Sequence, residues 1–265
     1  MIKIENLCYS IGKADIIKNI SLKINKGDFV AIIGENGAGK STITKLIAGL
    51  IKPSQGTVYL ANKDTKKLKA KEIAKTCSYL FQNPDKQICQ KTVREELLFS
   101  LEILDIDESE KEKRLEDILK IFNIDSSLAP FSLSRGQRQM LTFASVLITK
   151  PSVLILDEPT TGLDYKECML MMDLVKNLNE NGTTVIMVSH DMEIVSDFAK
   201  SIIVLNKGKL LDFGDTFDIM KKTSVLEKAS VMPSQIIALA NSLGDDFSSC
   251  LTAEDIANII ESRCK

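Results

Sequence analysis

The chain has 265 residues, a hydrophobic fraction of 44% and a formal net charge of -2. This length suffices for one large α/β domain, or for such a domain with a small appendage. The near-neutral charge argues against nucleic acid as the main partner. No apolar run approaches the roughly 18 residues that cross a bilayer, and residues 1–5 lack the basic and apolar regions of a signal peptide. We therefore expect any membrane role to be peripheral and on the cytoplasmic side.

The cysteines do not have the spacing of a metal cluster, because none of them forms a C-x-x-C pair. We expect these residues to be reduced and mostly buried thiols. They are Cys8, Cys77, Cys89, Cys168, Cys250 and Cys264.

The first 33 residues are expected to be rich in β-structure, because apolar and polar side chains alternate in Ile2–Glu5 and again in Ile16–Ile24. Phe29–Ile33 is an apolar run that predicts a buried strand. Residues 41–50 then predict a helix. Its apolar face consists of Ile43, Leu46, Ile47 and Leu50.

Between this strand and this helix lies Gly34–Thr42, which matches the phosphate-loop pattern G-x-x-x-x-G-K-[ST]. Glycines let the backbone curl round a polyphosphate, and the positive end of the following helix faces the anion. Lys40 can reach the β- and γ-phosphates, and the Ser41 hydroxyl can ligate Mg²⁺. The expected nucleotide contacts in this loop are Gly34, Asn36, Gly37, Gly39, Lys40, Ser41 and Thr42.

Short strands are predicted at residues 57–60 and 78–81. The lysine-rich segment between them, residues 63–75, is expected to be a solvated surface rather than a nucleic-acid patch. From about residue 84 to 149 the pattern becomes helical, with a capping box that begins at Thr92 and a helix that ends before Pro151. This block predicts a helical subdomain inserted between strands.

Two more apolar strands are predicted at residues 153–156 and 184–188. The helix between them begins at Asp164 and is expected to bury Leu170, Leu174 and Leu178. A hairpin over residues 202–213 and a helix over residues 216–222 follow. The alternation of strands and helices predicts an α/β fold with a mainly parallel sheet.

In such a sheet, ligands gather at the carboxyl ends of the strands. Asp157 and Glu158 follow one predicted strand directly, and His190 follows the next. An acidic pair in this position fits a Walker B motif. Asp157 would hold Mg²⁺ through water, and Glu158 would polarise the attacking water.

The tail is expected to form two short amphipathic helices. The first begins at Pro233 and ends at Gly244, and Thr252 caps the second. The side chains expected to face inward are Ile236, Leu239, Ala240 and Leu243 in the first helix, and Ile256, Ile259 and Ile260 in the second.

The ordered motifs of residues 1–222 resemble those of ATP-binding cassette (ABC) ATPases. Gln82 matches the Q-loop, Leu133–Gln137 the signature, Thr161–Asp164 the D-loop and His190 the switch histidine. The resemblance implies a P-loop NTPase with a mainly parallel sheet, an antiparallel β subdomain and a helical subdomain at about residues 84–149. Residues 223–265 are expected to be a small helical extension. Its proline-led helix is similar to the tail that helps two energy-coupling factor ATPases to pair, and a stabilising helical cap is the alternative.

The resemblance also implies a head-to-tail pair of cassettes around two molecules of ATP. The groups expected to act in catalysis are Lys40, Gln82, Glu158 and His190, and those expected around Mg²⁺ are Ser41, Gln82 and Asp157. Each chain would contact the nucleotide of its partner through Ser134, Gly136 and Gln137 of the signature, with Asp164 of the D-loop nearby.

Residues 81–88 are similar to the Q-loop of energy-coupling factor transporter ATPases, which drive the uptake of vitamins and of cobalt or other metal ions. This similarity implies an ATP-hydrolysing motor on the cytoplasmic face of the membrane. Its partners would be a second ATPase, a transmembrane coupling subunit and a substrate-binding membrane subunit, with Asn83–Gln87 as the docking segment.

Three other functions stay open. The chain could serve another class of ABC transporter, or be a soluble ABC ATPase acting on ribosomes or DNA. The sequence shows neither the second cassette with a charged linker nor the long coiled coil of those soluble classes. A pseudo-enzyme is the third alternative, against which intact Lys40, Glu158 and His190 argue.

The chain departs from the family pattern at a few positions. Ile11 stands where many cassettes stack an aromatic ring on adenine, and Tyr9 on the same strand face is the expected substitute. Arg135 replaces the first glycine of the signature, and Met140 stands where arginine is common. The chain's own site is thus complete while the signature that it offers to a partner is altered, which favours a heterodimer over a homodimer.

Overall fold

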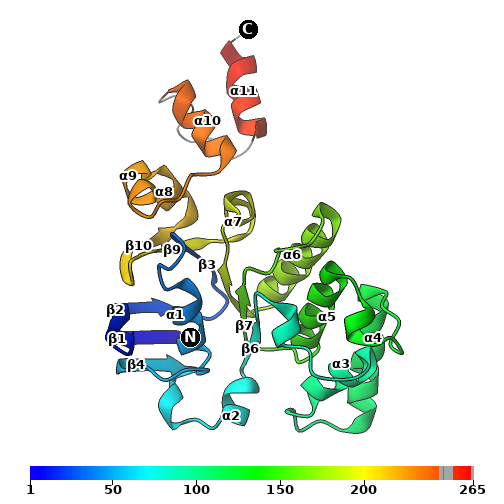
Figure 1. The fold of residues 1–265 in the computed structure, drawn as a ribbon. Helices are drawn as coiled ribbons and strands as arrows, with labels where there is room; N and C mark the ends of the chain where they lie inside the picture. Colours follow the sequence, from blue (N-terminus) through cyan, green and yellow to red (C-terminus); the bar gives the residue numbers. More distant parts are fainter. Residues whose placement is uncertain (245–246, 248–252, 264–265) are drawn as a thin grey trace.

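The structure is a computed structural model that describes residues 1–244, residue 247 and residues 253–263. One sheet is antiparallel and lies beside the amino terminus (Figure 1), with the strand order β2-β1-β4-β5. Its strands are β1 (Ile2–Ile11), β2 (Ala14–Ile24), β4 (Gln55–Leu60) and β5 (Lys63–Asp64). This sheet is the expected antiparallel β subdomain.

The second sheet is mainly parallel and has the order β10-β9-β3-β8-β7-β6. Its strands are β3 (Phe29–Ile33), β6 (Cys77–Leu80), β7 (Val153–Asp157), β8 (Thr184–Val188), β9 (Ser201–Asn206) and β10 (Lys209–Asp215). Within this sheet only the edge strand β10 runs antiparallel to its neighbour, β9, with which it forms a hairpin. The predicted α/β class with a mainly parallel sheet is confirmed.

The two faces of the parallel sheet bury different elements, as the alternation of side chains along β3 shows. Val30 and Ile32 pack with helix α1 (Lys40–Ile47) and the antiparallel sheet. Ala31 and Ile33 point to the opposite face and join the core of the helical subdomain. Both faces of a parallel sheet are normally covered in this way, which explains why its strands read as continuous apolar runs.

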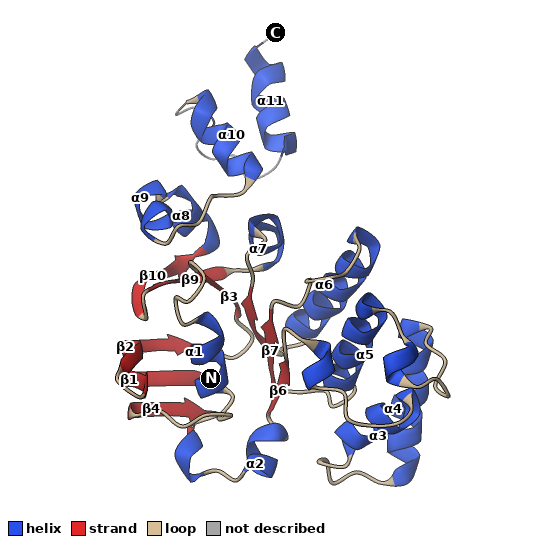
Figure 2. Cartoon of the chain, in the orientation of Figure 1, coloured by secondary structure: helices blue, strands red, loops and turns tan. Residues whose placement is uncertain are grey.

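The helical subdomain lies on one side of the parallel sheet in Figures 1 and 2. Its elements are η2 (Pro84–Lys86), α3 (Val93–Leu101), α4 (Glu108–Phe122), η3 (Pro130–Ser132) and α5 (Arg135–Leu147). The remaining helices are η1 (Thr65–Lys67), α2 (Ala70–Ala74), α6 (Tyr165–Glu180), α7 (Met192–Phe198), α8 (Thr216–Lys221), α9 (Thr223–Lys228), α10 (Gln235–Leu243) and α11 (Ala253–Arg263). The capping box at Thr92 forms as predicted.

The buried face of α6 differs in part from the prediction. Leu174 and Leu178 are partly buried and pack against the core, but Leu170 is 41% exposed. The completely buried side chains are Met171, Met172 and Val175, so the centre of the buried face lies about 100° round the helix axis from the leucine stripe. Leu50 was also wrongly expected to be buried, because α1 ends at Ile47 and the chain turns away at Gly49.

The tail departs from the prediction in three ways. An unpredicted helix, α9, packs Leu226 into the core of the main domain. In α10, Ala240 is buried and Ile236 partly buried as expected, but Leu239 and Leu243 are exposed and Ile237 is buried instead. In α11, Ile256 is buried as expected, but Ile260 is exposed. The predicted cap Thr252 lies outside the described residues.

The cysteines are less uniformly buried than expected. Cys77 is buried, and burial raises the pKa of its thiol to about 12. Cys8 and Cys168 are half-buried, and Cys89 is exposed; these four are free thiols. Cys250 and Cys264 lie outside the described residues. Among the helices that the structure describes, none is both long enough and apolar enough to traverse a bilayer.

Candidate functional site

The glycine loop between β3 and α1 has the backbone that its sequence predicts. Gly39 forms the N-cap of α1 in a left-handed conformation. A Cβ atom at Gly34 would lie 2.1 Å from the carbonyl oxygen of Leu205, so only glycine fits there. Lys40 is buried and its Nζ atom donates to the carbonyl oxygens of Gly34 at 2.7 Å and Glu35 at 2.9 Å.

Burial lowers the pKa of the Lys40 ammonium, and the carboxylates of Glu158 and Asp157 oppose this shift. A cavity of about 370 Å³ lies over the loop. It is lined by Ile16, Asn36, Gly37, Gly39, Lys40, Ser41, Thr42, Gln82 and Glu158. Tyr9 is not among these residues, whereas Ile16 of β2 is, so the structure brings to the loop an aliphatic side chain that the sequence pattern did not indicate.

Asp157 ends β7 beneath this cavity and is 3% exposed. Its Oδ1 atom accepts a hydrogen bond from the Ser41 hydroxyl at 2.9 Å, and its Oδ2 atom accepts one from the Tyr79 hydroxyl at 2.9 Å. Burial raises the pKa of Asp157, although both hydroxyls favour the ionised form. Ser41 and Asp157 thus present two oxygen atoms at one point of the loop.

Tyr79 was not selected from the sequence. It lies in β6, and its hydroxyl also lies 3.0 Å from Thr44 Oγ1 of α1. The sequence does indicate that Tyr79 has a buried partner, because a tyrosine within an apolar strand needs one for its hydroxyl. The sequence pattern alone does not identify that partner as Asp157.

Three polar side chains meet at the carboxyl ends of adjacent parallel strands. Gln82 Nε2 donates to Glu158 Oε2 at 2.5 Å, and His190 Nε2 lies 2.9 Å from Glu158 Oε1. The strand order β8-β7-β6 explains this meeting, because His190, Glu158 and Gln82 follow β8, β7 and β6 respectively. Glu158 adopts a left-handed φ of 51°, and its backbone N–H donates to the Val188 carbonyl at 3.0 Å.

A left-handed backbone is unfavourable for a residue with a Cβ atom and is found mainly where the surroundings enforce it, often at functional sites. Here it turns the Glu158 carboxylate toward Gln82 and His190. Glu158 is thereby held by both neighbours at the edge of the cavity over the glycine loop.

The predicted signature forms the start of α5 and does not line that cavity. Ser134 is the N-cap, and its side chain and that of Gln137 each bond the other's backbone N–H, at 3.2 and 2.9 Å. Gly136 is buried, and a Cβ atom there would lie 2.9 Å from Glu167 Oε2. Asp164 caps α6 by accepting from the Glu167 N–H at 2.8 Å, so signature and D-loop pack together.

The two departures in the signature have different surroundings. Met140 is 6% exposed and belongs to the core of the helical subdomain, so it does not alter the surface near Ser134. Arg135 is exposed, and a Cβ atom at Gly162 would lie 3.3 Å from its Nε atom. The Arg135 side chain therefore lies along the D-loop of its own chain.

The segment before α10 lies close to His190. A cavity of about 620 Å³ is lined by residues of both regions, among them Asn36, His190, Met232 and Pro233. The backbone N–H of Gln235 donates to Glu193 Oε1 at 2.7 Å, which ties the start of α10 to α7.

The sequence profile of the ABC transporter family matches residues 17–161, more than half of the chain. The chain belongs to the ABC transporter family. A relative from Caldanaerobacter subterraneus, provisionally named an ABC transporter ATP-binding protein, is 42% identical over 87% of this chain. A similarly named relative from Methanosarcina acetivorans is 36% identical over 98% of the chain. The match covers 41% and 44% of these two relatives, so the cassette spans less than half of their length.

Solved structures agree with this assignment. The dimeric cassette MJ0796 in a post-hydrolysis state with ADP and phosphate is 32% identical, with a TM-score of 0.74 over 82% of this chain and 99% of that one. The cbiO1 protein of Clostridium perfringens, described as part of the transporter complex cbiONQ, is 30% identical, with a TM-score of 0.73 over 86% of this chain and 93% of that one. The fold is therefore that of a P-loop cassette ATPase.

Proposed function

We propose that the cassette binds ATP with Mg²⁺ and hydrolyses it as the motor of an energy-coupling factor type importer. The observation that carries the catalytic part is the meeting of Gln82, Glu158 and His190 beside Lys40 and Ser41. Hydrolysis of a phosphoanhydride requires a base, side chains that orient it and a phosphate loop, and all of these lie at the carboxyl edge of the parallel sheet.

The residues present fit Mg²⁺ and a triphosphate. Mg²⁺ prefers hard oxygen ligands, and the Ser41 hydroxyl with the buried Asp157 carboxylate supplies them. When bound, the metal would neutralise charge on the phosphates. Lys40 would leave its loop carbonyls for the γ-phosphate, while Gln82 and His190 hold Glu158 against an attacking water. The loop contacts would come from Gly34, Asn36, Gly37, Gly39 and Thr42.

The signature is proposed to act on the ATP of a partner cassette. Ser134 and Gln137 are exposed at the start of a helix whose positive end suits an anion, and neither lines the cavity of its own chain. The dimeric state of the similar cassette MJ0796 supports this arrangement. Residues 223–265 are proposed to help pairing, since Leu239 and Leu243 of α10 are 46% and 43% exposed.

The importer type rests on residues 81–88 and on the similarity to cbiO1, a part of the complex cbiONQ. We propose that this chain lies at the cytoplasmic face of the membrane and assembles there with a transmembrane coupling subunit and a substrate-binding membrane subunit. A vitamin or a metal ion would be the cargo, selected by the membrane subunits.

A crosslinking experiment tests docking at Asn83–Gln87. In a Cys89→Ser background, which removes an exposed thiol nearby, Lys86→Cys is expected to crosslink to the transmembrane subunit in intact membranes. Lys86 is exposed on η2, and Lys67→Cys is a control at another exposed position, on η1. We expect a product from position 86 and background labelling from position 67. Equal yields would contradict docking here.

We further propose that the chain pairs with a different cassette, because Arg135 alters the signature that it would offer to a copy of itself. ATPase rates per site, measured for the chain alone and with candidate partner cassettes, are expected to be several-fold higher in a mixed pair. Arg135→Gly, which restores the family residue, is expected to raise the rate of the chain alone. If the homodimer hydrolyses ATP as fast as every mixed pair, and Arg135→Gly does not change its rate, the heterodimer proposal is wrong.

A further inference from the structure

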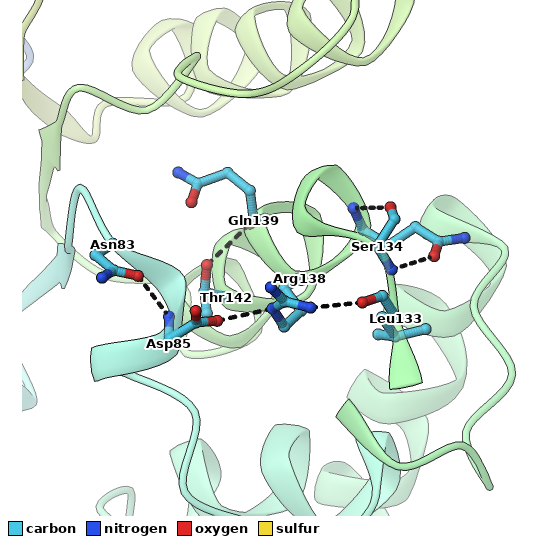
Figure 3. Close-up of polar contacts among 8 residues, drawn as sticks. Asn83, Asp85, Leu133, Ser134, Arg138, Gln139 and Thr142 are labelled. Carbon is cyan, nitrogen blue, oxygen red and sulfur yellow. Dashed lines mark hydrogen bonds and ion pairs between the residues drawn. The ribbon is translucent and has the colours of Figure 1, made fainter. Parts of the chain in front are cut away.

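Arg138 in the first turn of α5 joins two segments that lie far apart in the sequence (Figure 3). Its Nε atom donates to Asp85 Oδ1 at 2.7 Å, and its Nη1 atom donates to the Leu133 carbonyl oxygen at 2.6 Å. Asp85 lies in η2, inside the proposed docking segment, and Leu133 directly precedes Ser134 of the signature. One side chain thus connects the docking segment to the signature loop.

This connection has little freedom. The guanidinium is planar with donors in fixed directions, and the Arg138 side chain is 19% exposed. The backbone of Asp85 is itself held, because its N–H donates to Asn83 Oδ1 at 3.0 Å. A displacement of Asp85 must therefore either break the ion pair or shift the guanidinium against the Leu133 carbonyl.

The same segment also reaches the chain's own catalytic side. Gln82 contacts Glu158, and Gln87 Oε1 accepts from the backbone N–H of Phe81 at 3.2 Å. Gln87 Nε2 lies 3.3 Å from Ser145 Oγ in the last turn of α5. Residues 82–87 consequently touch the active site at one end and the signature helix at the other.

We propose that Asp85 and Arg138 are positioning residues, through which a subunit docked on Asn83–Gln87 sets the position of Ser134 and thereby the hydrolysis of ATP held by the partner cassette. This inference rests on the proposed function. Because Asp85 is 47% exposed, its ion pair contributes little to stability, so a merely structural role predicts no loss of activity.

The test measures ATP hydrolysis separately at the two nucleotide sites of an assembled pair of cassettes. With Glu158→Gln in this chain, turnover comes from the partner's ATP and uses this chain's signature. With the corresponding glutamate replaced in the partner, turnover comes from this chain's ATP. Asp85→Asn is expected to lower the first rate about fivefold or more and to leave the second within twofold. Asp85→Glu, which keeps the carboxylate, is expected to restore the first rate.

Glu112→Gln is the matched control. Glu112 is 46% exposed, close to the 47% of Asp85, and pairs with Arg94 in the same subdomain, but this pair lies between α3 and α4. The control is expected to change neither rate. Equal losses at both sites, or none at the partner's site, would overturn the inference.

Amide hydrogen exchange of the chain alone supplies a readout that does not depend on ATPase activity. Asp85→Asn is expected to speed exchange at residues 133–137, while Glu112→Gln leaves it unchanged. Unchanged exchange with Asp85→Asn would overturn the inference. A pair that shows no hydrolysis at either site before any substitution, combined with faster exchange in Asp85→Asn, would instead count against the proposed function alone.

Discussion

Glu158→Gln is expected to lower the turnover of ATP by about 10²–10⁴-fold, the usual contribution of a general base. Glutamine keeps the shape of the side chain and can still bond Gln82 and His190, but it cannot accept a proton from water. The affinity for ATP is expected to stay within about threefold of the unsubstituted chain, because the phosphate loop does not depend on Glu158 for its conformation.

Single-turnover hydrolysis and nucleotide binding should be measured on the same preparation. Glu180→Gln, an exposed residue at the end of α6, is a control that should retain full turnover. His190 is the chain's only histidine, so its imidazole NMR signals report whether the site is intact in the variant. Near-normal turnover in Glu158→Gln with an intact site would show that the base lies elsewhere.

Asp157→Asn is expected to lower Mg²⁺-dependent hydrolysis by about 10²–10³-fold, because a metal contributes several kcal/mol of transition-state stabilisation. The amide keeps the volume of the side chain and can still bond the Ser41 and Tyr79 hydroxyls. It does not supply the negative charge that holds Mg²⁺. Titration with Mg²⁺ at saturating ATP should show a weaker apparent affinity for the metal, and Asp173→Asn on the exposed side of α6 should not.

The same substitution has an opposite effect on stability. Burial raises the pKa of the Asp157 carboxyl, so the native state holds this proton more tightly than the unfolded chain does. Stability is therefore lost as the pH rises from the ordinary carboxyl pKa through the raised native value. Without Mg²⁺ and ATP, Asp157→Asn is expected to be less sensitive to this rise and at least as stable at neutral pH. Thermal melts across this range check the sign, and a variant that is less stable at neutral pH would contradict it.

The sequence by itself determined the phosphate loop, the buried strands and the acidic pair after β7. These features are local: a run such as Phe29–Ile33 and a glycine loop followed by a helix carry their structure in adjacent residues. The sequence also placed Glu158 and His190 at the same edge of the sheet, because parallel strands present their carboxyl ends together.

Only the tertiary structure decided which of these groups touch. The order β8-β7-β6 makes Gln82 and His190 the two neighbours of Glu158, and the pairing of β6 with β7 brings the Tyr79 hydroxyl to Asp157. Strand order depends on pairings between segments that lie far apart in the chain, and no local pattern encodes it. The buried stripe of α6 was decided in the same way, because the periodicity marks apolar positions but the packing partner selects which of them face the core.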